Sequence, residues 1–102
     1  MSNAVHLNIY KLKKNASTEE FLLAVENLVK EEISKKKGYL SFKLMLDKDT
    51  WVDEVTFETM EDLKNFEEEA KNPSQVAQHF YSFIDFMAKG GKHHKLTVMK
   101  QL

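Results

Sequence analysis

Polar and apolar side chains alternate in four separate stretches of the chain, and this period of two predicts four β-strands. The first stretch covers residues 5–13, where Val, Leu and Ile positions are separated by polar ones. The second and third, residues 40–46 and 51–57, flank the turn-forming residues 47–50 and so predict a hairpin. The last, near residues 96–98, predicts a final strand.

Between these stretches the apolar residues recur every three or four positions, which is typical of helices that bury one face. Ser17 provides an N-cap for the first helix, and Gly38 marks its end. Thr59 caps a second helical region that breaks at 72–73 and restarts with Pro73 in its first turn. The restarted segment is expected to bury a stripe formed by Val76, Phe80, Phe83, Ile84 and Met87.

The resulting order, strand-helix-strand followed by strand-helix-strand, predicts an α+β fold built from a split βαβ unit. Such a chain forms a four-stranded antiparallel sheet with the helices on one face. With 102 residues there is room for one domain, spanning 1–102. The other sheet face is left bare, so we expect a partner to cover it, most simply a second copy of the chain.

Strand alternation assigns each residue to a face of the sheet. The helix side is predicted to take Val5, Leu7, Ile9, Leu40, Phe42, Leu44, Trp51, Val55, Phe57, Leu96 and Val98. The opposite face is predicted to take His6, Asn8, Tyr10, Ser41, Lys43, Met45, Val52, Glu54, Thr56, Glu58, His93, Lys95, Thr97 and Met99. This second composition suits either a solvated surface or a self-complementary interface. The predicted dimer interface comprises His6, Tyr10, Lys43, Glu54 and His93.

Two titratable residues stand out from their surroundings. Asp53 falls in the apolar phase between Trp51 and Val55, so it must hydrogen-bond a partner, lie near water in a cleft, or be turned outward by a bulge. His79 lies at the edge of the apolar helical stripe, where its ring either faces a cleft or bonds to backbone or water. If both face one cleft, they form a candidate proton-transfer site.

Composition excludes several classes of function. The chain has no cysteine, which removes disulfide and thiolate chemistry. All 15 basic residues are lysine and the net charge is −1, so nucleic-acid binding is not expected. No apolar run approaches the length of a membrane span, and no export signal is evident, which predicts a cytoplasmic protein. Adjacent His93 and His94 point to opposite faces of a strand, so no metal site is predicted.

Three segments carry a family resemblance: residues 51–63, the break at 72–73 and residues 79–85. Together with the element order, they make the chain similar to the dimeric α+β barrel superfamily, and especially to antibiotic biosynthesis monooxygenase-like domains. The resemblance implies a ferredoxin-like subunit. It also implies that two sheets pack through their bare faces into a barrel, and that each subunit holds a pocket between its sheet and helices.

By the same resemblance the chain binds a small aromatic molecule and acts as a monooxygenase without a cofactor, on a phenolic or quinone-like compound. Asp53 or His79 would accept the proton, and Trp51 would form a stacking wall. The implied ligand-binding residues are Leu7, Ile9, Phe42, Leu44, Trp51, Phe66, Phe80 and Phe83.

Two alternatives remain open. One is a non-catalytic ligand-binding or stress-related barrel. The other is a haem-binding variant, because haem-degrading relatives use an asparagine on the first strand, a tryptophan on the second helix and a later histidine. His79 matches that histidine, but Phe66 replaces the tryptophan and Asn8 is assigned to the other face.

Overall fold

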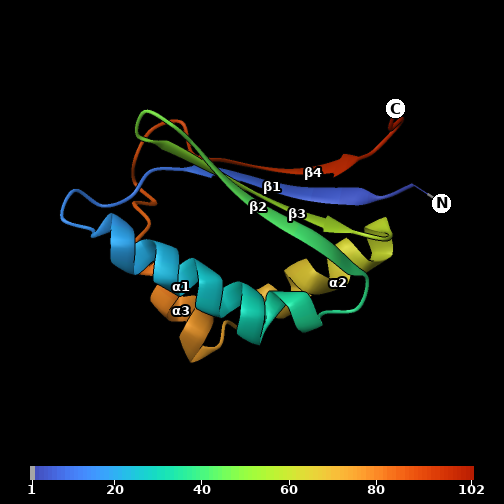
Figure 1. Ribbon diagram of the computed structural model, residues 1–102, viewed down its shortest axis with the longest axis horizontal. Helices are drawn as coiled ribbons and strands as arrows, with labels where there is room; N and C mark the ends of the chain where they lie inside the picture. The colour runs from blue at the N-terminus through green and yellow to red at the C-terminus, as the bar shows by residue number, and fades with distance from the viewer. Residues whose placement is uncertain (1) are drawn as a thin grey trace.

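The computed structural model describes residues 2–102, which form one sheet and one layer of helices (Figure 1). In chain order the elements are β1 (Ala4–Tyr10), α1 (Thr18–Glu31), the 3-10 turn η1 (Ile33–Lys35), β2 (Tyr39–Asp47), β3 (Thr50–Phe57), α2 (Met60–Ala70), α3 (Gln75–Tyr81) and β4 (Lys92–Thr97).

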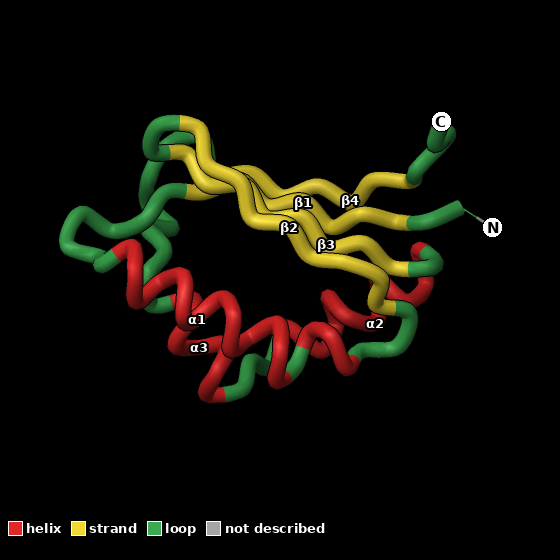
Figure 2. The backbone as a smooth tube through the Cα atoms, in the orientation of Figure 1, coloured by secondary structure: helices red, strands yellow, loops and turns green. Residues whose placement is uncertain are grey.

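The four strands pair antiparallel throughout, in the order β2-β3-β1-β4. All three helices lie beneath one face of this sheet, and among the described residues no element covers the other (Figure 2). The predicted α+β, ferredoxin-like architecture is therefore confirmed.

Local side-chain caps set the start of each helix. Ser17 accepts a hydrogen bond from the Glu20 N–H at 3.2 Å, as the sequence predicts for α1. Thr59 caps α2 in the same way, because its hydroxyl accepts a hydrogen bond from the Asp62 N–H at 3.1 Å. The third helix is capped by Ser74 rather than started by Pro73, because the Ser74 hydroxyl accepts from the Ala77 N–H at 3.1 Å.

Gly38 joins the helix layer to β2 in a backbone conformation that favours glycine, with φ at +82°. A Cβ atom at this position would collide with the buried carboxylate of Asp62 in the first turn of α2. The Gly38 carbonyl also accepts a hydrogen bond from the Glu58 N–H at 2.8 Å. The start of α2 is thus packed directly against the glycine backbone.

Aromatic rings fill the space between the sheet and the pair α1 and α3. Phe21 is fully buried and lies at the centre, with ring centroids 5.0 Å from Trp51, 5.8 Å from Phe80 and 5.9 Å from Phe83. We call the cluster of Phe21, Trp51, Phe80 and Phe83 the aromatic core. The Tyr10 ring packs edge-on against Phe80 and so joins it.

The segment after Tyr81 differs from the predicted long helix. Instead of continuing, it runs back beside the chain that follows β1: Lys13 N–H donates to the Phe83 carbonyl and Asp85 N–H to the Lys11 carbonyl, both at 2.9 Å. Phe83 and Ile84 are buried as predicted, but Met87 is 92% exposed. The prediction of a buried Met87 was wrong because backbone pairing ends the helical period.

The predicted faces of β1 and β4 are inverted. Asn8 lies opposite Asp53, and Tyr10 lies opposite Trp51, so these residues share the face that meets the helices. By the same pairing, His6 and His93 also point to the helix side, whereas Val5, Leu7, Ile9 and Leu96 line the uncovered face. Leu40 is 45% exposed, since the bulge at residues 39–41 displaces it from the apolar phase.

Candidate functional site

A cavity of about 670 Å³ lies between the sheet and the helices. Aromatic residues form much of its wall, including Phe42 on β2, Phe66 on α2 and Phe80 on α3. Its polar part comes from β1, β3, α2 and β4. Such a cavity, mostly apolar with a few converging polar groups, has the size and character of a small-molecule site.

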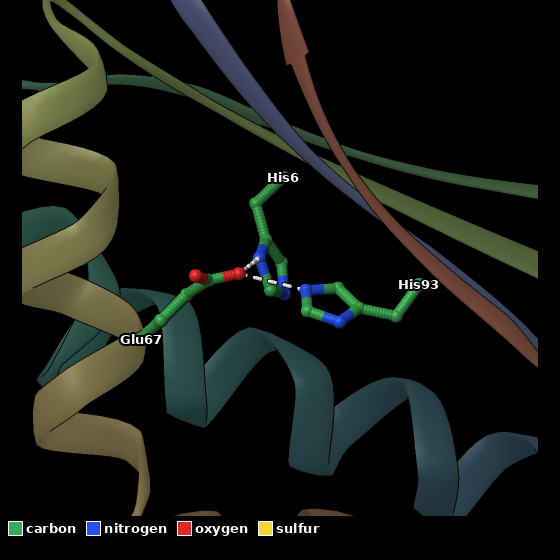
Figure 3. A group of neighbouring side chains, drawn as sticks. All are labelled: His6, Glu67 and His93. Carbon is green, nitrogen blue, oxygen red and sulfur yellow. Dashed lines mark hydrogen bonds and ion pairs between the residues drawn. The ribbon is translucent and has the colours of Figure 1, made fainter.

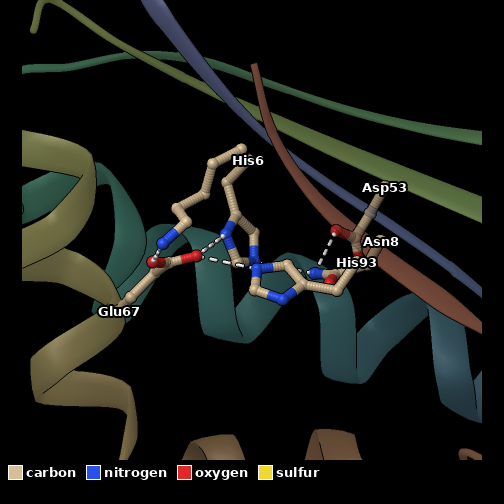
Figure 4. Close-up of polar contacts among 6 residues, drawn as sticks. His6, Asn8, Asp53, Glu67 and His93 are labelled. Atoms are coloured by element: carbon tan, nitrogen blue, oxygen red, sulfur yellow. Dashed lines mark hydrogen bonds and ion pairs between the residues drawn. The ribbon is translucent and has the colours of Figure 1, made fainter. Parts of the chain in front are cut away.

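A row of hydrogen-bonded side chains borders this cavity, and we call it the polar row: Tyr10, Asp53, Asn8, His6, Glu67 and His93. Figure 4 shows the row from Asp53 to Glu67 and His93. At its inner end the Tyr10 hydroxyl donates to Asp53 Oδ2 at 2.8 Å. The other Asp53 oxygen accepts from Asn8 Nδ2 at 3.1 Å, and Asn8 Nδ2 lies 3.0 Å from His6 Nε2. The row continues from His6 to Glu67 and His93.

The contacts of the Asn8 amide are satisfied by one tautomer of His6. Its nitrogen has two hydrogens, and both are used: one is donated to Asp53 and one to His6 Nε2. In that tautomer the His6 ring is neutral, with its proton on Nδ1, from which it donates to Glu67 Oε2 at 3.0 Å. Asn8 thereby links the carboxylate on β3 to the histidine on β1.

Glu67 on α2 forms the outer end of the row (Figure 3). Its Oε2 atom receives both His6 Nδ1 at 3.0 Å and His93 Nε2 at 2.7 Å. Its other oxygen, Oε1, lies 3.5 Å from Lys95 Nζ. Two imidazole nitrogens and an ammonium group, from β1 and β4, thus surround one carboxylate.

Burial changes the acid-base properties of the inner residues. It raises the pKa of the Asp53 carboxyl group, although the hydrogen bonds from Tyr10 and Asn8 oppose this effect. Burial, followed by the nearby Asp53 charge, also raises the pKa of Tyr10 far above its ordinary value. Tyr10 is therefore a fixed hydrogen-bond donor, and Asp53 is the group that can exchange a proton.

The outer residues shift in the opposite direction. Burial lowers the pKa of His6, and the charges of His93 and Lys95 add to this, while Glu67 opposes it. Partial burial alone would raise the pKa of Glu67, but the hydrogen bonds from His93 and His6, together with the charge of Lys95, outweigh it and lower the pKa. These shifts favour an ionised Glu67 next to a neutral His6.

The structure brings together only part of the predicted ligand site. Four of its residues border the cavity from the helix side of the sheet: Phe42, Asp53, Phe66 and Phe80. Ile9 also borders it, although its strand phase turns the side chain toward the uncovered face. The others lie elsewhere. Trp51 and Phe83 belong to the aromatic core, Leu44 is half-buried on β2 beside Asp53, and Leu7 points to the uncovered face.

Asp53 and His79 do not meet. The His79 side chain is exposed on α3 and packs edge-on against Phe83, with ring centroids 5.1 Å apart, and it does not border the cavity. Asp53 is buried with hydrogen-bond partners, since Tyr10 and Asn8 each donate to one of its carboxyl oxygens. The residues that sequence reasoning missed as its companions are Asn8, Tyr10, His6 and Glu67.

Three residues predicted for the dimer interface lie on the wrong side of the sheet for that role. His6 and His93 contact Glu67, and Tyr10 packs in the aromatic core. Lys43 and Glu54 do lie on the uncovered face, opposite each other on β2 and β3. The correction follows from the phase of β1 and β4, which the hydrogen-bond demand of Asp53 and the contact with α2 determine.

Comparison of the sequence with protein families finds no matching family model, and comparison with curated proteins finds no significant match. The structure does have similar solved structures. A single-site variant of SnoaB, a cofactor-independent oxygenase from Streptomyces nogalater, superposes with a TM-score of 0.77 at 10% identity, over 100% of this chain and 98% of that one. The monooxygenase from the gene ActVA-Orf6 of Streptomyces coelicolor, in complex with nanaomycin D, gives 0.72 at 14% identity, over 99% and 91%.

A dimeric protein of ferredoxin-like fold and unknown function from Bacteroides fragilis gives a TM-score of 0.61 at 14% identity, over 93% of this chain and 95% of that one. Candidate antibiotic biosynthesis monooxygenases are also among the similar structures. The chain therefore has the fold of the antibiotic biosynthesis monooxygenase-like proteins. None of the helices described within residues 2–102 is long and apolar enough to cross a membrane.

Proposed function

We propose that this protein is a cofactor-independent monooxygenase that acts on a phenolic or quinone-like compound bound in the cavity. The observation that carries the proposal is Asp53, a buried carboxyl group at the wall of an aromatic-lined cavity, held in place by Tyr10 and Asn8. The fold shared with SnoaB and the ActVA-Orf6 monooxygenase supports it.

The chemistry follows from what an electron-rich ring can do by itself. Loss of a proton converts such a substrate into an anion that can pass electrons directly to O2, so the protein needs only a base and a dry site. Overall, the phenol and the ring C–H carbon opposite it become two carbonyl groups: the O–H and C–H hydrogens leave with one atom of O2 as water, and the other oxygen atom enters the new carbonyl. Asp53 is the base in this proposal, since burial raises the pKa of its carboxyl group and makes it a better proton acceptor than an exposed carboxylate.

His79 is less well placed for this role than the sequence suggests, because its exposed ring does not border the cavity. The pair Asp53→Asn and His79→Ala therefore tests the assignment. With a panel of hydroquinones and polycyclic phenols, Asp53→Asn should lower oxygen uptake about a hundredfold or more, while His79→Ala should leave it unchanged. Circular dichroism controls for folding; equal activity of Asp53→Asn and wild type would remove Asp53 from the mechanism.

A non-catalytic ligand-binding or stress-related protein is the second candidate, favoured by the same cavity. Wild-type protein that binds these compounds without consuming oxygen would establish it. For the haem-binding variant the structure supports one of the two implied residues and not the other. Asn8 borders the cavity, whereas His79 does not. Titration with haemin, followed by visible absorbance, separates that variant from the other two.

We also propose that two chains associate through the uncovered sheet face. This face carries Val5, Leu7, Ile9 and Val52 from the central strands, and on the outer strands Met45 and Leu96 remain 42% and 44% exposed. Apolar side chains on an uncovered face favour an interface between copies. The dimeric state of the Bacteroides fragilis protein of similar fold supports the proposal.

Light scattering at micromolar concentration tests the association. Wild type should have twice the monomer mass, and Leu7→Glu should be a monomer because the charge would be buried between the sheets. Leu23→Glu is the matched control, since Leu23 is 59% exposed on α1, on the other side of the molecule. A monomeric wild type would refute the interface.

A further inference from the structure

We propose that His6, Glu67 and His93 bind a divalent transition-metal ion at the edge of the cavity. Two imidazoles and one carboxylate are brought together from three separate elements, β1, α2 and β4. One ligand atom from each lies within 4.8 Å of the others. The three side chains are drawn in Figure 3, where both rings point toward the Glu67 carboxylate.

The donor atoms already converge. His6 Nδ1 and His93 Nε2 approach the same oxygen, Glu67 Oε2, at 3.0 and 2.7 Å. Ligands of a tetrahedral Zn²⁺ ion lie about 2.1 Å from the metal and hence about 3.4 Å from each other. To admit the ion, the two imidazole nitrogens must therefore move a few tenths of an ångström away from Glu67 Oε2, and the two nitrogens, which lie within 4.8 Å of each other, must come to about 3.4 Å. His93 can move most easily, because its side chain is 49% exposed.

The donor set also selects the kind of metal. Two neutral imidazoles with one carboxylate suit Zn²⁺, Fe²⁺ and neighbouring first-row ions better than Ca²⁺ or Mg²⁺, which prefer oxygen ligands. Three protein ligands leave at least one coordination position open. All three residues border the cavity, so that position can face a bound small molecule. The proposal goes beyond the cofactor-free reaction described above and does not depend on it.

Two neighbouring residues affect metal binding at this cluster. When Nδ1 of His6 binds a metal, Nε2 carries the ring proton, so the Asn8 amide must turn its oxygen toward Nε2 and give up the hydrogen bond that its nitrogen donates to Asp53. Lys95 acts against binding, since its ammonium group lies 3.5 Å from Glu67 Oε1.

Calorimetric titration of the metal-free protein with Zn²⁺ tests the site without any substrate. We expect one Zn²⁺ per chain, with affinity falling about a hundredfold or more in His93→Ala and Glu67→Gln. His94→Ala is the matched control, because His94 is exposed on the same strand but points to the opposite face. Equal loss of affinity in His94→Ala, or no saturable binding by wild type, would overturn the proposal.

Co²⁺ gives a second readout that does not depend on folding stability. Its visible spectrum should show intense bands of a four- or five-coordinate site in wild type and lose them in His93→Ala. A spectrum of fully hydrated Co²⁺ would mean that the cluster is only an ion-paired network. Oxygen uptake by chelator-treated protein is measured separately, so failure of the metal site and failure of the oxygenase proposal are distinguishable.

Discussion

Two regions packed beneath the same sheet are built in opposite ways. The aromatic core between the sheet and the helices α1 and α3 consists of rings in mutual contact, centred on Phe21. The polar row consists of single hydrogen bonds that run from Tyr10 toward His93. Tyr10 belongs to both, with its ring in the core and its hydroxyl on Asp53. The comparison teaches that the core supplies stability and the row supplies chemistry, so mutations should affect the two differently.

The largest effect is expected in the aromatic core. Phe21→Ala should lower the free energy of unfolding by about 3 to 5 kcal/mol, because it leaves a cavity among four aromatic rings. Urea denaturation measures the change. Leu23→Ala, two positions along the same helix at an exposed site, should change it by less than about 0.5 kcal/mol. Similar losses in both variants would mean that helix α1 is rotated from the position described.

An intermediate effect is expected at the inner end of the polar row. Asp53→Ala should cost about 1 to 3 kcal/mol, because the Tyr10 hydroxyl and one Asn8 hydrogen lose their buried acceptor. Adding Tyr10→Phe to Asp53→Ala should recover part of the loss, since the orphaned hydroxyl is then removed. Strictly additive losses in a double-mutant cycle would show that the two groups do not interact.

The smallest effect is the pH dependence contributed by His6. Its pKa is lower in the folded protein than the ordinary 6.5, so the unfolded chain binds the proton more readily. The contribution of His6 to the free energy of unfolding is therefore complete above pH 6.5, and it declines as the pH falls below that value. The pKa of Glu67 is also lowered, so its contribution to stability declines only when the pH falls below 4.5. The pKa of Asp53 is raised, so its contribution to stability changes with pH in the opposite direction.

Unfolding measured for wild type and His6→Gln between pH 7.5 and 5.5 isolates the histidine, because most other groups cancel in the difference. The stability advantage of wild type should shrink toward acid. An NMR titration of His6 that gave a pKa above 6.5 would contradict the buried, neutral ring next to Asn8.

The sequence was sufficient for the fold because periodicity and caps agree along nearly the whole chain. It was insufficient for the polar row because β1 offers two acceptable phases. Val5, Leu7 and Ile9 form one, and His6, Asn8 and Tyr10 form the other. Hydrophobicity predicts that the side chains of Val5, Leu7 and Ile9 face the helices. In the structure the other set faces them.

The signal that could have corrected the phase was Asp53. A carboxylate in the buried phase of β3 needs donors on the neighbouring strand, and only the second phase of β1 supplies them. The involvement of Glu67 could not be predicted in this way. It lies in a run of three glutamates, and only the packing angle of α2 decides which of them reaches His6.

Gly38 shows how far the site extends beyond residues with functional groups. Its α-carbon is in contact with Asp62, one and a half helical turns before Glu67 on the same helix α2. A Cβ atom at Gly38 would lie too close to the Asp62 side chain, including its Cβ, so that side chain or the start of the helix that carries Glu67 would have to shift. In a survey of all single substitutions, replacements of Gly38 should therefore be tolerated as poorly as replacements of His6 and His93. Related sequences that keep His6, Glu67 and His93 should also keep this glycine.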